Sequence, residues 1–237
     1  MYQLNSINKI YAAILLLLIL ATSVKIWKYK TWKRYYYTAS FSSPASYPVH
    51  VNNGQLILED GDIAYVGYST VNDGNNFGWG YGDSNDPTRK ERLPVKLVVQ
   101  YASFRDQSFY SDTIPLPVDA IKKAFSTVNA KGISTDLYQK PSVNRLDFVI
   151  GIANKGNIIV WLRGENFEET LLKHKIAPHE PSGDETYYET RLTKSQYLKR
   201  VFWIDSAKLE DFKAGLDKDA SYIDTPSQFK IRLKQKQ

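Results

Sequence analysis

The longest apolar stretch of the chain lies near its N-terminus. Fifteen uncharged residues, Ile10 to Val24, lie between Lys9 and Lys25. A helix that spans a membrane needs about 20 apolar residues, whereas the core of a cleaved signal peptide has roughly 7–15. Because flanking aromatic and basic side chains extend a short span to the membrane interfaces, we expect a retained transmembrane helix. A signal peptide cut after Ala21-Thr22-Ser23 is the alternative. The residues expected inside the bilayer are Ile10, Leu15, Leu18, Leu20 and Val24.

A basic and aromatic collar follows this stretch and completes a predicted membrane anchor over residues 1–34. One basic residue precedes the apolar stretch and five follow it closely. Because basic residues stay on the cytoplasmic side of membranes, this count places the rest of the chain in the cytoplasm. The collar also suits RNA or anionic lipid, but beside an apolar segment a membrane interface is the simpler explanation. The collar comprises Lys25, Trp27, Lys28, Lys30, Trp32, Lys33 and Arg34.

The rest of the chain alternates apolar and polar residues in short runs. A Ser-, Pro- and Ala-rich stretch within 35–48 predicts a linker. Turn residues at Asp60-Gly61 and at Asn154-Lys155-Gly156 lie between apolar runs, which predicts two hairpins. Further strands are expected over 94–104, 109–114 and 168–176.

Apolar residues at helical spacing predict helices elsewhere in the body. One helix is expected to begin after Pro117, and others over 193–203 and from Ser206 to Leu216. The tail over 230–237 is predicted to be an edge strand or a solvated segment. We therefore expect a mainly β or α+β fold, with a largely antiparallel sheet and two to four helices in a single body over 49–237.

Charge and cysteine content exclude several classes of function. Six basic residues and no acidic residue lie before residue 35, so residues 35–237 carry 25 basic and 25 acidic side chains. A neutral body weakens any nucleic-acid interpretation of the net charge of +6, and we expect no nucleic-acid partner. The absence of cysteine excludes disulfides, thiolate-bound metal, a thiol nucleophile and a lipidated cysteine.

A loop over 72–87 is rich in glycine, asparagine and aromatic residues. Exposed aromatic rings among flexible glycines would grip a sugar, a lipid or a partner protein. The alternative is a long turn whose Trp79 covers the core, because large aromatic side chains are mostly buried. Arg163 follows Trp161 by two residues on a predicted strand, so we expect it to cover that ring by stacking on the same face. The candidate binding residues are Phe77, Trp79, Tyr81, Asp83 and Arg163.

No pattern in the sequence identifies a reaction. Histidine and acidic residues gather over 174–185, but their spacing matches no zinc signature, and a solvated loop explains them. No Gly-x-Ser-x-Gly turn is present, and the glycines around Trp79 lack the spacing of a nucleotide-binding loop. We expect no catalytic residue, metal or cofactor, and a function without catalysis is favoured over an enzyme.

The body carries short sequence blocks in a defined order between Tyr47 and Lys175. They are Tyr47-Pro48-Val49-His50-Val51, Leu56-Ile57-Leu58-Glu59-Asp60-Gly61, Gly78-Trp79-Gly80, Leu93-Pro94-Val95-Lys96-Leu97, Phe109-Tyr110, Leu116-Pro117, Gly151-Ile152 and Val160-Trp161-Leu162-Arg163-Gly164. In this order and spacing they resemble the bacterial envelope family catalogued as domain of unknown function 2931. Most members of that family are lipoproteins. The resemblance implies a β-rich domain displayed at the bacterial envelope, with no established activity.

Family members encoded beside secreted antibacterial toxins, especially lipase-like effectors, look like immunity proteins. The resemblance therefore implies a protein partner that the body binds and neutralises. It also favours a single-pass protein of the inner membrane with a periplasmic body, in conflict with the basic collar. Where a lipoprotein carries its lipidated cysteine, this chain has Ala21-Thr22-Ser23-Val24, so a retained helix would replace the acyl anchor. The alternatives are an envelope enzyme or receptor for a lipid or glycan, and a structural subunit of a membrane complex.

Overall fold

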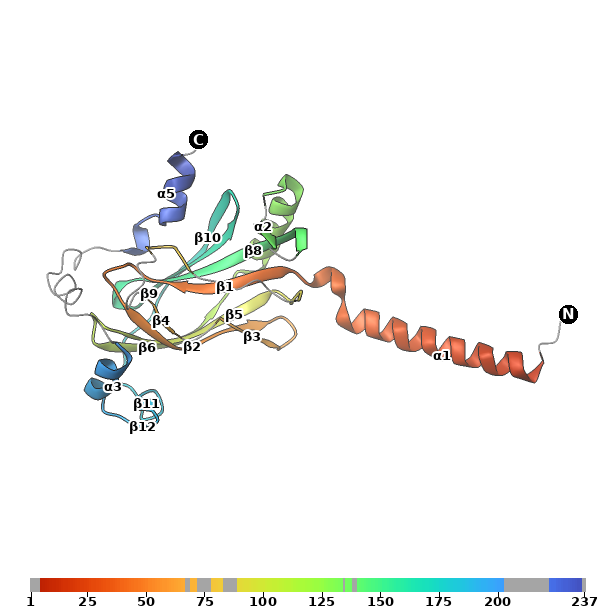
Figure 1. The fold of residues 1–237 in the computed structure, drawn as a ribbon, viewed down its shortest axis with the longest axis horizontal. Coiled ribbons are helices and arrows are strands. Elements are labelled where there is room, and N and C mark those ends of the chain that lie inside the picture. Colours follow the sequence, from red (N-terminus) through yellow and green to blue (C-terminus); the bar gives the residue numbers. More distant parts are fainter. Residues whose placement is uncertain are drawn as a thin grey trace. The chain divides into compact units, whose positions relative to one another are not determined.

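The computed structural model describes residues 5–66, 69–71, 78–82, 89–133, 135–137, 140–202 and 222–235. The chain divides into two compact units, Met1–Arg34 and Tyr35–Gln237. The first unit contains a single long helix and the turn that follows it. In its described residues the second unit contains two five-stranded sheets, a small two-stranded sheet and further helices (Figure 1).

The helix of the first unit, α1 (Ser6–Tyr29), is longer than the uncharged stretch on which its prediction rests. The Asn5 side chain caps its start by accepting a hydrogen bond from the Asn8 amide at 2.8 Å, and Lys30 ends it in a left-handed conformation. Its 24 residues rise about 36 Å, which exceeds the roughly 30 Å of a bilayer core. None of its residues is buried within the protein. Its length and apolar composition suit both a membrane anchor and a signal sequence.

The collar comprises the last residues of α1 and the turn after it, which contact one another through cations and aromatic rings. A short turn, η1 (Thr31–Lys33), follows the helix. The Arg34 guanidinium lies 4.3 Å from the centre of the Tyr29 ring and donates a hydrogen bond to the Tyr29 carbonyl at 3.0 Å. Lys30 lies over the Trp27 ring, whereas Trp27 and Trp32 are exposed. Aromatic rings and cations therefore stand together at the end of an apolar helix, as they do at membrane interfaces.

The first sheet of the second unit has the strand order β1-β8-β9-β10, and β7 pairs with β8. Its strands are β1 (Tyr36–Ser42), β7 (Thr135–Leu137), β8 (Lys140–Ile152), β9 (Asn157–Gly164) and β10 (Phe167–Lys175). The second sheet has the order β3-β2-β5-β6, and β4 pairs with β2. Its strands are β2 (Val49–Leu58), β3 (Ile63–Tyr65), β4 (Ser69–Val71), β5 (Pro94–Ser103) and β6 (Ser108–Pro115). Among the described strands, all pairings are antiparallel except β1 with β8, which confirms the predicted α+β class with largely antiparallel sheets.

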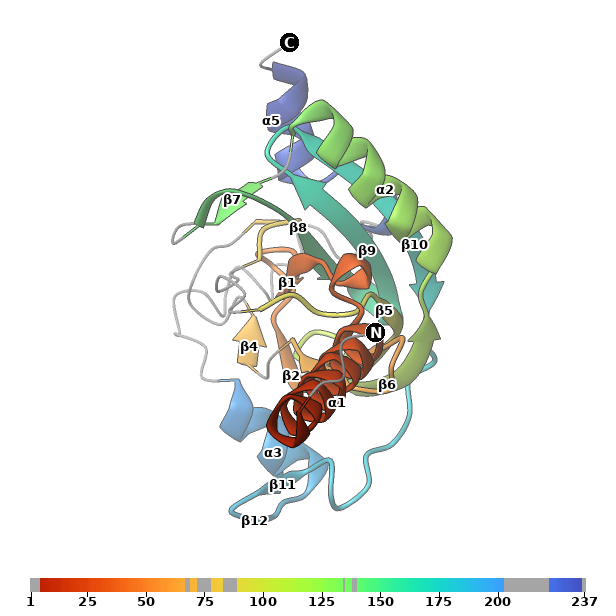
Figure 2. The ribbon, with the colours of Figure 1, turned by 90° about the vertical axis from the view of Figure 1, so that its right-hand side faces the viewer.

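The core lies between the facing sides of the two sheets. Alternate residues such as Leu97 and Val99 on β5 and Phe148 and Ile150 on β8 supply it. On β9, Val160 and Leu162 point into this core, whereas Trp161 belongs to a separate cluster on the outer face, as the two-residue alternation predicts. Helix α2 (Val118–Lys131) adds one apolar stripe to the core and runs beside β10 (Figure 2).

Two small helical elements cover the opposite outer faces of the sandwich (Figure 1). Helix α3 (Lys194–Val201) packs on Ala102 and Phe109 of the second sheet, next to the hairpin of β11 (Tyr187–Tyr188) and β12 (Thr190–Arg191). The C-terminal segment 222–235, which comprises the turn η3 (Tyr222–Asp224) and α5 (Gln228–Gln235), lies over the first sheet. The turn η2 (Asn154–Gly156) connects β8 to β9.

Most of the elements expected from the sequence are present. The hairpins at 58–63 and 152–157, the strands β5, β6 and β10, and the helices α2 and α3 confirm the predictions. The helix expected from Ser206 to Leu216 falls outside the described residues.

Two sequence-based expectations are wrong. The stretch predicted as a linker over 35–48 contains β1, which is largely buried and pairs with β8 from Tyr36–Arg145 to Ser42–Gly151. Of the two alternatives for the tail, the edge strand is wrong: residues 228–235 form the mostly exposed helix α5, at whose start the Ser227 hydroxyl accepts a hydrogen bond from the Lys230 amide at 3.0 Å. In both cases partners distant in sequence decide the conformation, and local composition gives no sign of them.

Candidate functional site

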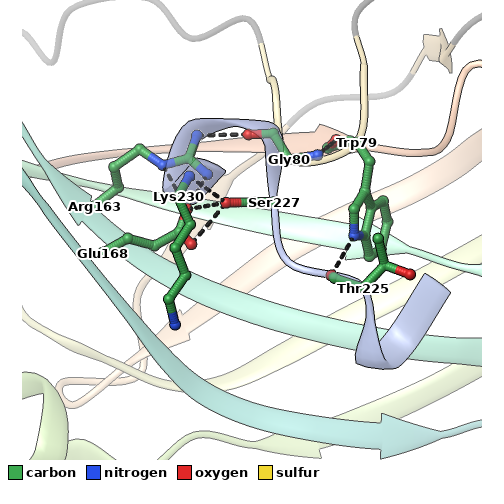
Figure 3. A network of polar contacts seen from close by, with 8 residues as sticks. Trp79, Gly80, Arg163, Glu168, Thr225, Ser227 and Lys230 are labelled. Atoms are coloured by element: carbon green, nitrogen blue, oxygen red, sulfur yellow. Dashed lines mark hydrogen bonds and ion pairs between the residues drawn. The ribbon is translucent and has the colours of Figure 1, made fainter. Parts of the chain in front are cut away.

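Two of the sequence-predicted binding residues, Trp79 and Arg163, meet on the outer face of the first sheet, beneath the C-terminal segment (Figure 3). The Trp79 ring stands edge-on against the Trp161 ring, with centroids 5.0 Å apart and planes at 76°. Its indole Nε1 donates a hydrogen bond to the Thr225 carbonyl at 2.9 Å. Because only 4% of Trp79 is exposed, its ring covers the sheet and holds the C-terminal segment.

Arg163 and Glu168 form a buried ion pair beside Trp79. The Nη2 atom of Arg163 lies 2.6 Å from Oε2 of Glu168, and its Nη1 atom donates to the Gly80 carbonyl, also at 2.6 Å. The Ser227 hydroxyl donates to the same carboxylate at 2.6–2.7 Å (Figure 3). The guanidinium stacks on Phe229 at 4.3 Å from the ring centre, so the ring that Arg163 covers is not the expected Trp161.

The fold thus brings together three of the five predicted binding residues. Tyr81 is half-buried and takes the Arg232 guanidinium over its ring at 4.9 Å. Trp79 and Arg163 are buried within the protein, which leaves little of either side chain for a partner. Phe77 and Asp83 lie outside the described residues.

A large open pocket lies instead on the outer face of the second sheet, beside α3. Its volume is about 930 Å³. Polar side chains of three adjacent strands form its floor: His50 and Asn52 on β2, Gln100 on β5 and Ser111 on β6. Its walls come from the segment 177–188 and from Tyr197 on α3. These strands alternate apolar residues toward the core with polar residues outward, which places the polar floor on the outer face.

Glu185 connects the wall of the pocket to its floor through hydrogen bonds. Its carboxylate accepts hydrogen bonds from His179 Nε2 at 2.7 Å, Gln100 Nε2 at 2.8 Å and the Ser182 amide at 2.8 Å. Asn52 Nδ2 donates to the Glu185 carbonyl at 3.1 Å. Burial by itself would raise the pKa of Glu185, but these donors outweigh it and lower the pKa to about 2. The carboxylate is therefore ionised and already engaged within the protein.

His50 lies at the base of the pocket among aromatic rings. Its ring stands edge-on to Tyr197 and Phe202, at centroid distances of 6.1 Å and 6.4 Å. Burial disfavours the imidazolium and lowers the pKa of His50 to about 4. Burial likewise raises the pKa of Tyr197 to about 12. At neutral pH both side chains are uncharged, so they offer ring faces and hydrogen bonds rather than charge.

The rim of the pocket presents two exposed tyrosines. Tyr187 and Tyr188 on β11 are 60% and 40% exposed, and the Arg200 guanidinium lies over the Tyr188 ring at 4.8 Å. Asp184, also at the rim, is ion-paired with Arg191 at 3.1 Å. Exposed tyrosines beside a polar cavity are typical of surfaces that bind proteins.

In the part of the chain that the structure describes, no three His, Asp or Glu side chains converge on a metal-sized site. The histidines over 174–185 instead form pairs: His179 with Glu185, and His174 with Asp112 at 2.7 Å. Sequence reasoning missed His50, Gln100 and Tyr197 as pocket residues. The chain order separates these residues widely, and no local motif marks them.

A comparison with protein-family models decides the relationship of this chain to known proteins. The model described as a protein of unknown function (DUF2931) matches residues 23–219. The chain belongs to this family. Searches of curated proteins and of solved structures found no match. The DUF2931 match includes every residue of the pocket as well as Trp79, Arg163 and Glu168, and it ends before the C-terminal segment.

Proposed function

We propose that the protein is a membrane-anchored binding protein of the bacterial cell envelope that holds a protein partner at the pocket beside α3. The observation that carries this proposal is the pair of exposed tyrosines, Tyr187 and Tyr188, at the rim of a 930 Å³ polar cavity. Tyrosine supplies a large contact area at little cost in conformational entropy and still forms hydrogen bonds. Both properties favour recognition of a protein surface.

The electrostatics of the pocket also favour binding over catalysis. Glu185 has a pKa of about 2 and is saturated with donors, so it is a poor proton acceptor at neutral pH. His50 is neutral and packed among rings. A pocket of neutral donors and ring faces gives shape and hydrogen-bond complementarity without a general acid or base.

The partner in this proposal is a secreted antibacterial toxin, such as a lipase-like effector, and the protein confers immunity by occluding it. The resemblance of the body to envelope proteins encoded beside such toxins supports this partner. Helix α1 anchors the protein in the inner membrane through Ile10–Val24, with the body in the periplasm. The basic collar favours the opposite orientation, and a C-terminal reporter that is active in one compartment only distinguishes the two.

The experiment is a binding assay between the purified full chain in detergent and the toxin encoded by the adjacent gene. We expect Tyr187→Ser with Tyr188→Ser to weaken binding at least tenfold, because rim aromatics contribute most of the energy of such interfaces. The matched control is Tyr65→Ser, since Tyr65 on β3 is 78% exposed and does not line the pocket. The immunity proposal fails if no neighbouring toxin binds and if deletion of the gene leaves cells no more sensitive.

The close pair of His179 and Glu185 favours a second candidate, an envelope hydrolase or receptor for a lipid or glycan. A carboxylate at 2.7 Å from Nε2 orients an imidazole in the pocket as it would a general base. Under this alternative, His179→Ala abolishes turnover of a phospholipid or glycan substrate while the fold persists. Under the binding proposal, no turnover of these substrates is detected for the unchanged protein.

A further inference from the structure

The outer face of the first sheet buries a charged pair, which is unusual for the outer side of a sandwich. Arg163 and Glu168 are directly opposite each other on β9 and β10, and their side chains are only 9% and 2% exposed. Outward positions on such strands normally carry polar groups that water solvates. Removing a charged pair from water costs several kcal/mol. The groups that cover this face must therefore supply hydrogen bonds to Arg163 and Glu168.

Residues 222–235 supply much of that cover through contacts typical of peptide recognition. Two hydrogen bonds engage the backbone of the segment: the Trp79 indole side chain donates to the Thr225 carbonyl, and the Gln228 amide donates to the Trp79 carbonyl at 2.9 Å. Two side chains anchor the segment, since the Ser227 hydroxyl donates to Glu168 and the Phe229 ring stacks on Arg163. Backbone hydrogen bonds combined with a few side-chain anchors are the means by which proteins bind peptides.

The segment is packed less completely than the core of the body. No residue of α5 is buried, and Tyr222 and Ile223 of η3 are only partly buried. A pocket of about 170 Å³ that is open to solvent lies beside the segment and the β9–β10 pair, lined by residues that include Trp161, Glu168 and Ser227. Interfaces between parts of a chain that can separate are more polar and less buried than a protein core.

The family match covers the residues of this face but not the segment 222–235. Trp79, Arg163 and Glu168 lie within the matched residues 23–219, whereas the covering segment lies outside them. The matched range thus includes the charged pair and the edge-on tryptophan pair, and it ends before the segment that covers them.

We propose that this face is a peptide-binding groove that the C-terminal segment 222–235 occupies in cis. The ligand in trans is a polypeptide with a serine or threonine followed two positions later by an aromatic residue. Its hydroxyl takes the place of Ser227 on the Glu168 carboxylate, and its ring takes the place of Phe229 on the Arg163 guanidinium. This groove is independent of the proposed pocket, which lies on the outer face of the other sheet.

The first test is hydrogen exchange, followed by mass spectrometry, on the unchanged full chain in detergent. We expect the backbone amides of 228–235 to exchange at least a hundredfold faster than those of β8 and β9, through an opening that leaves the sheets intact. Exchange of the segment at the same rate as the sheets, through global unfolding only, overturns the proposal, because the segment is then part of the core.

The second test supplies the segment in trans as a fluorescent peptide with the sequence of residues 222–235. We expect the full chain with Ser227→Ala and Phe229→Ala to bind this peptide at least tenfold more tightly than the unchanged chain does. The control chain carries Lys234→Ala at an exposed position of α5 and behaves like the unchanged chain. A peptide that carries the same two alanines does not bind.

Two outcomes of the second test contradict the proposal. One is a doubly substituted chain that unfolds cooperatively on heating and yet shows no affinity for the native peptide. The other is a doubly substituted chain that has lost cooperative unfolding, because the two anchors would then stabilise the whole body rather than occupy a separate groove.

Discussion

The Nε2 atom of His179 lies 2.7 Å from Oε1 of Glu185, and the same carboxylate oxygen accepts from Gln100 on the floor of the pocket. One carboxylate therefore joins the pocket wall to the second sheet. Its second oxygen accepts from the Ser182 amide, which fixes the turn within the wall. A single ionised side chain thus connects the wall of the pocket to its floor.

We expect Glu185→Gln to change the acid sensitivity of the protein. Because the pKa of Glu185 falls from 4.5 to about 2 on folding, the unfolded chain takes up the proton first as the pH drops. The stability due to this group is complete above pH 4.5 and is lost as the pH falls toward 2. Urea unfolding at pH 7 and at pH 3.5 measures it. After allowance for solvent screening, the stability lost between these two pH values should be smaller in the variant by about 1 kcal/mol.

His50 should govern a separate and higher pH range. Its pKa is lowered to about 4 in the folded protein, so between pH 6.5 and 4 the unfolded chain binds a proton that the folded chain does not. Stability due to neutral His50 is therefore lost as the pH falls through this range. His50→Phe keeps a ring against Tyr197 and cannot be protonated. We expect its unfolding free energy to change less than that of the unchanged protein between pH 7 and 4.5, and an identical pH dependence would contradict the assignment.

Arg163 and Glu168 should show strong coupling in stability. Arg163→Met leaves the Glu168 carboxylate, which is 2% exposed, without its cation and should cost about 3–5 kcal/mol. Adding Glu168→Gln removes the unpaired charge and retains an acceptor for the Ser227 hydroxyl. We expect the double variant to recover more than half of the loss in urea unfolding. Additive effects of the two substitutions would show that the pair is not a closed unit.

Two glycines with positive φ offer a matched test of backbone strain. Gly132 ends α2 at φ 62° with no atom within 4 Å of an added Cβ, whereas Gly156 at φ 78° would place that Cβ against the Ile176 carbonyl and the Tyr110 ring. Gly132→Ala should cost about 1 kcal/mol, the ordinary penalty of a left-handed conformation. Gly156→Ala should cost at least twice as much in thermal or urea unfolding. Equal losses would mean that the contact with Ile176 relaxes freely.

Hydrophobic patterning was sufficient for the elements whose partners lie close in sequence. The hairpin of β8 and β9 follows from two apolar runs around a three-residue turn, and α2 follows from a proline at its start and an apolar stripe. The alternation on β9 correctly separated Val160 and Leu162 from Trp161. In each case the information needed is contained within about 15 residues of sequence.

Patterning was insufficient where small or polar residues are buried by distant partners. The composition of β1 resembles a linker because it contains Thr38, Ser40 and Ser42. The strand that buries these residues, β8, lies more than 100 residues away in the sequence. The alternation of Ile231 and Leu233 suggested a strand, but the segment is a helix. The Ser227 hydroxyl caps its start by accepting from the Lys230 amide, and the Phe229 ring packs on Arg163. Long-range contacts override such weak local preferences.

The sequence by itself determined that this protein has an apolar N-terminal helix with a basic collar, a neutral body rich in β-strands and no cysteine chemistry. Only the tertiary structure decided that Trp79 and Arg163 are buried under the C-terminal segment and that His50, Gln100, Glu185 and Tyr197 form a pocket. The physical reason is that apolar periodicity is encoded locally. The burial and pairing of polar side chains depend instead on which strands and loops the fold brings together.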